Sequence, residues 1–352
     1  MRARELGIEI GRLSPGPENA ITDVAGVAVG HTTLVEGDDV RTGVTVVRPH
    51  GGDPGTDPLF AGCHRLNGNG EVTGLEWLRE SGMLTTPIGL TNTHSVGVVR
   101  DALVSAGPLE VGRWSLPVVG ETYDGFLNDI NGQHVRAEHV HDALRGAAGG
   151  PVAEGNVGGG TGMICHGFKG GIGTSSRVVA EDDGGFTVGV LVQANHGRRP
   201  RLRVDGVPVG ARIGADVVPL PTAGGDGAGS IIVLAATDAP LLPGQCDRLA
   251  QRACLGIGRT GGMGEHSSGD FAVCFATGNR GLSAEKGERR QLLYELTMLS
   301  HDDCNALFEA VIDATEEAIL NALLAAETMT GRAGNTVHEL PVDLLLGTLR
   351  SR

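Results

Sequence analysis

Aromatic residues and positive charge are both scarce in this chain of 352 residues. Only 3% of the residues are aromatic, and 28 Lys and Arg stand against 42 Asp and Glu, which gives a formal net charge of −14. A balance this acidic argues against nucleic acid or an anionic membrane surface as a partner, and it suits a cationic substrate. No apolar run approaches the roughly 18 residues of a membrane-spanning helix. We therefore expect a globular protein with no nucleic-acid and no membrane partner.

The cysteines show none of the spacings that bind metals or mark a disulfide scaffold. Neither a CxxC pair nor an HExxH motif is present, so we predict no metal and no cofactor. The cysteines resemble small buried apolar residues in a reducing compartment, and the first residues lack the apolar core of a signal peptide. Both observations favour a cytoplasmic protein. The six cysteines are Cys63, Cys165, Cys246, Cys254, Cys274 and Cys304.

The chain is rich in glycine, with 58 residues that follow no Gly-X-Y period. They separate short β-branched runs and helical periodicities, which excludes a collagen-like chain and predicts many tight turns. Strands and helices alternate without a regular βαβ repeat, so we predict an α+β, layered fold. The expected strands are 24–29, 44–47, 186–192, 231–236 and 271–276, and the expected helices are 135–147, 244–255 and 303–329.

One glycine-rich stretch, 155–177, resembles a phosphate-binding loop at first sight. Its GMICHGFK segment approaches GxxxxGK, but Phe168 separates Gly167 from Lys169 and no Ser or Thr follows the lysine. The hydroxyl that would bind Mg²⁺ is therefore missing. We predict turns whose backbone approaches another element closely, rather than a nucleotide site.

Ser230 is the candidate nucleophile, because it stands between the glycine-rich segment GDGAG and the apolar run IIVLAA. Cleavage after Gly229 would give Ser230 a free α-amine with an ordinary pKa of about 7.7–8.0, so one residue could be both nucleophile and general base. The alternative is a polar residue that opens a buried strand. We interpret 205–229, where Pro and Gly are concentrated, as an exposed connection inside one domain, where cleavage is tolerated.

Five further polar residues precede or follow apolar runs. Ser268 and Asp270 share a strand face and could relay a hydrogen bond to a nucleophile, although a turn at a strand entrance is the simpler interpretation. Asn195 ends an apolar run and could donate to an oxyanion, as could the phenol of Tyr123, one of only two tyrosines. A turn asparagine and a core tyrosine are the alternatives. Glu121 could hold a substrate ammonium.

Eight ordered blocks of the sequence carry a family resemblance. They are ITDVAGVAVGHTTL at 21, RTGVTVV at 41, LNGNGEVTGL at 66, PIGLTNTHSVG at 87, ETYDG at 121, GNVGGGTGM at 155, FKGGIGTSSR at 168 and SIIVLAATDAPLLPGQCDRLAQRACLGIGRTGG at 230. Together they resemble the self-processing L-aminopeptidase/D-amidase-esterases and β-peptidyl aminopeptidases, peptidase family S58. The resemblance implies a four-layer αββα sandwich of the N-terminal-nucleophile-hydrolase type, autoproteolysis between Gly229 and Ser230, and a homo-oligomer, a tetramer of cleaved protomers. It also implies Ser230 as nucleophile, oxyanion support from Asn195 and Tyr123, a Ser268/Asp270 relay and an amine site at Glu121.

We therefore expect one domain, 1–352, that is autocleaved into 1–229 and 230–352. The expected activity releases N-terminal residues from small peptides, amides or esters with a free amine, through an acyl-enzyme on Ser230. One alternative is acyl transfer to an amine, as in the ornithine acetyltransferases, which use threonine. A second alternative is an uncleaved protein that binds a small molecule.

Overall fold

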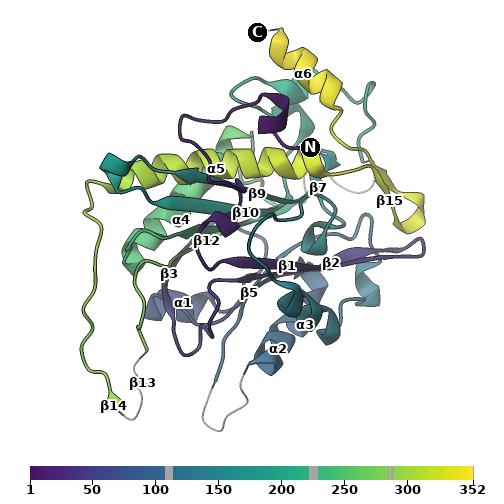
Figure 1. The fold of residues 1–352 in the computed structure, drawn as a ribbon. Helices are drawn as coiled ribbons and strands as arrows, with labels where there is room; N and C mark the ends of the chain where they lie inside the picture. The colour runs from purple at the N-terminus through teal and green to yellow at the C-terminus, as the bar shows by residue number, and fades with distance from the viewer. Residues whose placement is uncertain (108–113, 222–228, 284, 287–288, 352) are drawn as a thin grey trace.

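The protein is built in four layers, two β-sheets face to face with helices on both outer sides (Figure 1). The computed structural model describes residues 1–107, 114–221, 229–283, 285–286 and 289–351. The first sheet has the order β1-β2-β5-β6 and the second β4-β3-β12-β11-β10-β9. The first comprises β1 (Ala28–Glu36), β2 (Val40–Arg48), β5 (Ile88–Asn92) and β6 (Val118–Thr122); the second comprises β4 (Met83–Leu84), β3 (Leu59–Gly68), β12 (Gly269–Ala276), β11 (Ser230–Thr237), β10 (Thr187–Asn195) and β9 (Gly171–Val178).

Two pairs of helices form the outer layers. The pair α2 (Val96–Ala106) and α3 (Ala137–Gly146) covers the four-stranded sheet, and α4 (Pro243–Arg259) and α5 (Cys304–Ala325) cover the six-stranded sheet. Three clusters of buried apolar side chains fill the three spaces between the four layers. The described chain also contains α1 (Leu75–Ser81), α6 (Val342–Arg350) and the short strands β7 (Ile164–Cys165), β8 (Phe168–Lys169), β13 (Glu285–Lys286), β14 (Arg289–Arg290), β15 (Met329–Thr330) and β16 (Thr336–Val337).

Strand β11 lies inside this sandwich with both faces covered, which explains its unbroken apolar sequence. Ile231, Val233 and Ala235 face α4 and α5, whereas Ile232 and Leu234 face the other sheet. It pairs antiparallel with β10 on one side and parallel with β12 on the other. The layered α+β sandwich expected from the sequence is confirmed.

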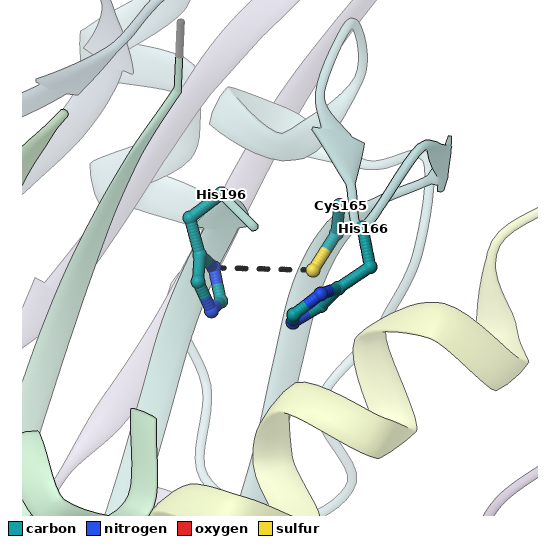
Figure 2. A group of neighbouring side chains, drawn as sticks. All are labelled: Cys165, His166 and His196. Atoms are coloured by element: carbon teal, nitrogen blue, oxygen red, sulfur yellow. Dashed lines mark hydrogen bonds between the residues drawn. The ribbon is translucent and has the colours of Figure 1, made fainter. Parts of the chain in front are cut away.

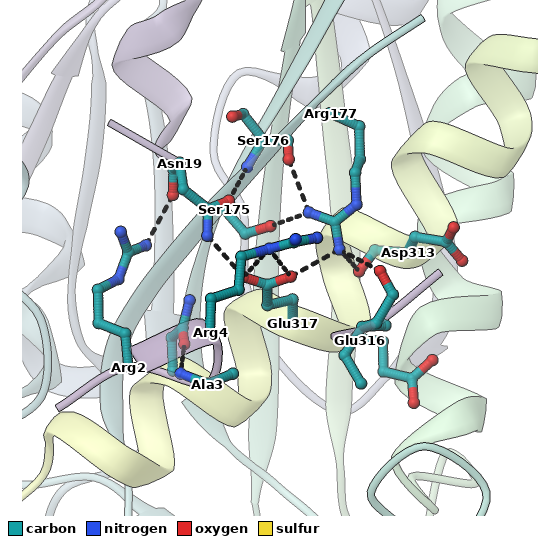
Figure 3. A network of polar contacts seen from close by, with 12 residues as sticks. Arg2, Ala3, Arg4, Asn19, Ser175, Ser176, Arg177, Asp313, Glu316 and Glu317 are labelled. Atoms are coloured by element: carbon teal, nitrogen blue, oxygen red, sulfur yellow. Dashed lines mark hydrogen bonds and ion pairs between the residues drawn. The ribbon is translucent and has the colours of Figure 1, made fainter. Parts of the chain in front are cut away.

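A buried network joins the outer helix α5 to β9 and the N-terminal segment (Figure 3). The side chains of Arg177 and Glu317 are both fully buried, with 2.7 Å between Arg177 Nη2 and Glu317 Oε2. Arg177 also donates to the carbonyl of Ile10 over 2.7 Å, and the Asn19 amide donates to Glu317 Oε1 over 2.5 Å. Burial lowers the pKa of Arg177, while the Glu317 carboxylate counteracts that shift. The buried Glu317 carboxylate of α5 is therefore paired inside the protein.

The glycine-rich stretch 155–177 behaves as the sequence indicated. A Cβ on Gly173 would lie 2.0 Å from the Ala318 carbonyl oxygen of α5, so glycine allows strand and helix to touch. The buried Lys169 ammonium donates to three backbone carbonyls, those of Gly160, Met163 and Gly170. A lysine committed in this way is not placed to bind a phosphate.

Two expectations about the elements were wrong in detail. The run 24–29 is not one strand, because β1 begins at Ala28 after a 3₁₀ turn over Ile21–Asp23. Within 205–229, the side chains of Val207, Val209 and Ile213 are buried beside the helices, so this part of the connection is not an exposed loop. Residues 222–228 lie outside the described part of the chain.

The remaining elements agree closely with the sequence. The runs 44–47, 186–192, 231–236 and 271–276 correspond to β2, β10, β11 and β12, and the helices expected at 135–147, 244–255 and 303–329 are α3, α4 and α5. Among the described residues, every helix is too short or too polar to span a bilayer.

Candidate active site

Ser230 is the first residue of β11 and lies at the end of the space between the two sheets. Side chains alternate along a strand, so Ser230 shares the face of Ile232, which packs between the sheets. The residue is 5% exposed. Its Oγ donates to the Gly229 carbonyl oxygen over 2.7 Å and accepts a hydrogen bond from the Gly269 backbone N–H over 3.1 Å. The hydroxyl is thus held beside the carbonyl of the preceding peptide bond.

Position 229 requires a glycine because there is no room for a side chain, and not because of its backbone torsion angles. A Cβ at this position would lie 2.2 Å from the Asn195 carbonyl oxygen and 3.0 Å from His196 Cα. A larger residue would push the peptide bond before Ser230 away from β10. The sequence argument relied on the conformational freedom of glycine, whereas the structure gives close approach as the reason.

Asn195 is the direct partner of Ser230 in the antiparallel β10–β11 ladder. Both of its polar side-chain atoms are engaged, since Nδ2 donates to the Tyr123 carbonyl over 3.0 Å and Oδ1 accepts the Ile164 N–H over 2.7 Å. The carboxamide is therefore fixed on the Ser230 face, and its second Nδ2–H remains for another acceptor. The structure brings these two candidate residues together.

Ser268 and Asp270 form the expected pair, with Ser268 Oγ donating to Asp270 Oδ1 over 2.6 Å. However, Asp270 shares the alternation of Ala272 and Cys274, which face α4 and α5, while Ser230 points to the other face. The Asp270 carboxylate accepts the backbone N–H of Ile231, and burial raises its pKa to about 6. The Ser268–Asp270 pair therefore contacts the backbone N–H of Ile231, the residue after Ser230, and does not contact the Ser230 hydroxyl.

Tyr123 contributes its backbone to the site in a way that the sequence did not indicate. Its carbonyl holds the Asn195 amide, whereas its ring folds over Gly125, where a Cβ would lie 2.3 Å from the phenol oxygen. The residue is 47% exposed. In the described chain no hydrogen bond joins the phenol to Ser230.

Glu121 ends up almost fully buried at the end of β6. Its carboxylate accepts hydrogen bonds from the Thr93 hydroxyl and, over 2.9 Å, from the Glu71 backbone N–H. Burial raises its pKa above the ordinary value. A Cβ on Gly70 would lie 3.0 Å from both Glu121 Oε1 and Gly269 Cα, so only a glycine separates the carboxylate from the backbone that contacts Ser230.

A cleft of about 410 Å³ opens next to this glycine. Phe271, Leu75 and Val72 provide apolar walls, and the rim carries charged side chains of both signs. Phe271 follows Gly269 on β12 by two residues, so the cleft and Gly269 lie along the same strand face. A small organic substituent near Glu121 could be accommodated there.

Sequence reasoning missed Gly269 and a second group, Cys165, His166 and His196. Gly269 acts through its backbone N–H, which has no residue signature, although SSGD at 267–270 already pointed to this turn. The other three side chains are buried and close together, and they are potential metal ligands. The adjacent Cys165 and His166 were the available signal, but His196 lies thirty residues further along the chain.

Comparison with known proteins places the whole chain in one family. Peptidase family S58 matches residues 19–337. The β-peptidyl aminopeptidase BapA of Sphingosinicella microcystinivorans is 50% identical, with 97% of this chain and 89% of that protein covered. A β-aminopeptidase structure from Burkholderia sp. matches with a TM-score of 0.94 and 56% identity, covering 100% of this chain and 99% of the other.

A further solved structure connects the family with the fold. The L-aminopeptidase D-Ala-esterase/amidase of Ochrobactrum anthropi, described as a prototype of the serine aminopeptidases and a variant of the Ntn-hydrolase fold, matches with a TM-score of 0.91 and 43% identity. The alignment covers 99% of this chain and 98% of that one. The chain with Ser230 beside its own Gly229 carbonyl therefore belongs to peptidase family S58 and is a hydrolase of the aminopeptidase class.

Proposed function

We propose that the chain, one domain of residues 1–352, cleaves itself between Gly229 and Ser230. Residues 1–229 and 230–352 then act together as a serine aminopeptidase. The substrates are small peptides, amides or esters with a free N-terminal amine. The observation that carries the proposal is the 2.7 Å separation between Ser230 Oγ and the Gly229 carbonyl oxygen, on a serine that is also hydrogen-bonded by Gly269.

Self-cleavage begins with attack of Ser230 Oγ on the Gly229 carbonyl carbon. The new C–O bond forms as the C–N bond breaks, and the proton of the hydroxyl goes to the departing nitrogen. This leaves an ester between Gly229 and Ser230 and a free Ser230 amine. Water hydrolyses the ester, which yields the Gly229 carboxylate and restores the hydroxyl.

The freed amine serves as the general base for turnover. Ser268 and Asp270 support this role, because their hydrogen-bonded pair lies at the Ile231 backbone next to the amine. The amine accepts the proton from Ser230 Oγ and passes it to the leaving amine, and water releases the acyl group. Burial around this amine favours its neutral, proton-accepting form.

Asn195 is the proposed donor to the oxyanion, since its second Nδ2–H is on the Ser230 face. A donor that is fixed before the reaction lowers the barrier by about 3–4 kcal/mol. Tyr123 supports this donor through its carbonyl, and oxyanion contact by its phenol stays a prediction from the family resemblance. Glu121 is the proposed site for the substrate ammonium, and its two internal donors orient its carboxylate.

We also propose that the protein is cytoplasmic and forms a homo-oligomer, a tetramer of cleaved protomers. All six cysteines are free thiols, which suits a reducing compartment. Leu292 and Leu293 are 77% and 86% exposed on the extended segment that projects from the sandwich, and a second copy would cover them (Figure 1). Light scattering after gel filtration would measure the mass and reject the tetramer if only protomer-sized particles appear.

One pair of preparations tests the function. Wild-type protein should run on a denaturing gel as two bands, and the smaller fragment should begin Ser-Ile-Ile-Val. It should also release p-nitroaniline from aminoacyl p-nitroanilides that have a free α-amine. Ser230→Ala should run as one band without activity, and Ser105→Ala, a matched serine change on α2, should behave as wild type. An uncleaved wild-type chain, or cleavage and activity in Ser230→Ala, would refute the proposal. Turnover only with an amine acceptor present would indicate acyl transfer instead.

A further inference from the structure

Three buried side chains that the proposed reaction does not use lie close together (Figure 2). Cys165 ends β7, His166 follows it in the turn, and His196 follows Asn195 at the end of β10. One nitrogen or sulfur atom of each lies within 4.8 Å of those of the other two. Cys165 Sγ is 3.9 Å from His196 Nδ1, and the two imidazole rings meet edge to face with centroids 5.1 Å apart.

The imidazoles have lone pairs available for a ligand. Among the described residues, His166 Nε2 is buried without a hydrogen-bond partner, and His196 Nδ1 faces the Cys165 thiol, 3.9 Å from Sγ. His166 Nδ1 lies 3.3 Å from the Arg198 carbonyl, which can only accept, so the proton sits on Nδ1 and the lone pair on Nε2. A ring held in this way by a backbone carbonyl is the usual arrangement around a metal-binding histidine.

The spacing of the sulfur and nitrogen atoms fits coordination to one ion. Typical metal–sulfur and metal–nitrogen lengths place such ligands about 3.6–3.8 Å apart in tetrahedral or trigonal geometry. For Cys165 Sγ and His196 Nδ1 the observed 3.9 Å requires a contraction of about 0.1–0.3 Å, and the ligand atoms of all three residues lie within 4.8 Å of one another. A thiolate with two imidazoles is a donor set that suits copper and zinc ions.

The net charge of the filled site discriminates between such ions. With two neutral imidazoles, a thiolate and Cu⁺ cancel, whereas a thiolate and Zn²⁺ leave one positive charge among buried side chains. Because uncompensated buried charge is costly, the site favours the monovalent ion.

We propose that Cys165, His166 and His196 form a buried binding site for a thiophilic d¹⁰ metal ion, with Cu⁺ preferred over Zn²⁺. Binding replaces the thiol proton by the metal and releases that proton to solvent. The site is structurally linked to the active site, since His166 N–H donates to the His196 carbonyl over 2.7 Å and His196 is bonded to Asn195. The ion would fix the backbone that carries Asn195.

The test measures metal content and thermal stability of the whole protein. Purified protein is incubated without oxygen with Cu⁺, or separately with Zn²⁺, desalted and analysed for metal. We expect about one equivalent of Cu⁺ per chain, a smaller amount of Zn²⁺ after the same desalting, and a rise in Tm of at least about 3 °C with Cu⁺. Retention of Zn²⁺ alone would overturn the stated preference, and retention of neither ion would overturn the site.

Two variants locate the bound ion, and one controls for the loss of a buried thiol. Cys165→Ala and His166→Asn should each reduce bound Cu⁺ by at least about tenfold. Asparagine is chosen because His166 has φ +50°, a region that asparagine tolerates. Cys304→Ser, which removes a buried thiol at the start of α5, should keep the full equivalent. Full retention of Cu⁺ in either folded ligand variant would overturn the assignment, and each variant is checked for its metal-free Tm.

Discussion

Asn195 and Ser230 are opposed partners where β10 ends and β11 begins, and their side chains lie on the same face of the sheet. The antiparallel register alone sets this relationship, so a candidate donor from one part of the chain is fixed against a candidate nucleophile from another. The Tyr123 carbonyl and the Ile164 N–H hold the carboxamide in place. Preorganisation of this kind is what transition-state stabilisation requires.

Removal of the Asn195 carboxamide should slow the chemistry rather than weaken substrate binding. We expect Asn195→Ala to lower kcat about 10²- to 10³-fold with little change in KM, because the donor acts on the charge that develops in the transition state. Steady-state kinetics on the cleaved form would measure this split. An equal kcat with a raised KM would instead indicate a role in ground-state binding.

The buried Asp270 should appear in the pH profile. Burial raises its pKa to about 6, so the carboxylate is protonated below that pH and ionised above it. The free Ser230 amine must also lose a proton before it can act as the general base. A plot of log kcat/KM against pH should therefore have a slope of two below about pH 6, and a slope of one between pH 6 and the pKa of this amine. Asp270→Asn should remove the steeper part and lower the plateau. An unchanged slope of two in this variant would exclude Asp270 from the profile.

Recognition of the substrate amine should depend on Glu121. A charged hydrogen bond contributes about 1.5–3 kcal/mol, so acetylation of the substrate amine should lower kcat/KM by roughly 10- to 150-fold. Glu121→Gln should narrow the difference between free and acetylated substrates and leave self-cleavage intact, because processing involves no substrate ammonium. Equal hydrolysis of both substrates by the wild-type enzyme would argue for a general amidase.

The pair Arg177–Glu317 should be a stability determinant. Both side chains are fully buried, so Glu317→Ala leaves an uncompensated guanidinium and should cost about 3–5 kcal/mol in the free energy of unfolding. Urea unfolding in the Ser230→Ala background, where the chain stays in one piece, gives the cleanest measurement. The control is Glu309→Ala, which removes the partner of the exposed Arg12 and should cost at most about 1 kcal/mol. Similar losses in the two variants would contradict this interpretation.

The two fragments should remain associated without a disulfide. In the six-stranded sheet, β11 and β12 lie between β3 and β10, which belong to the other fragment, so separation would expose two backbone ladders. Gel filtration under reducing, non-denaturing conditions should give one peak that contains both fragments. Separate elution would mean that the cut divides independent domains.

The sequence predicted the strands and helices well because their apolar periods are long and bounded by glycine turns. The sequence predicted that Ser268 and Asp270 lie together. It could not predict that they lie on the sheet face opposite to the Ser230 side chain, because that depends on the register between β11 and β12. It could not identify Gly269 or the Tyr123 carbonyl, because backbone groups contribute through position and not through side-chain type. His196 joined Cys165 and His166 only through the packing of β7 against the end of β10, which local spacing does not encode. The run 24–29 was overextended because residues 24–27 form a turn before β1, and the apolar residues of this turn resemble those of a strand.

The interleaved strand order also constrains when the peptide bond before Ser230 can be cut. An intact chain assembles the sheet by a unimolecular reaction, in which β10 and β11 remain tethered to each other. Two separate fragments would have to find one another first, so their assembly would depend on concentration and would compete with aggregation of exposed strand edges. Cleavage after folding avoids this competition, but a cleaved protein that later unfolds loses its tether. Efficient folding would thus be possible only for the uncleaved precursor. The lifetime of the cleaved, mature enzyme would then be set by its rate of unfolding.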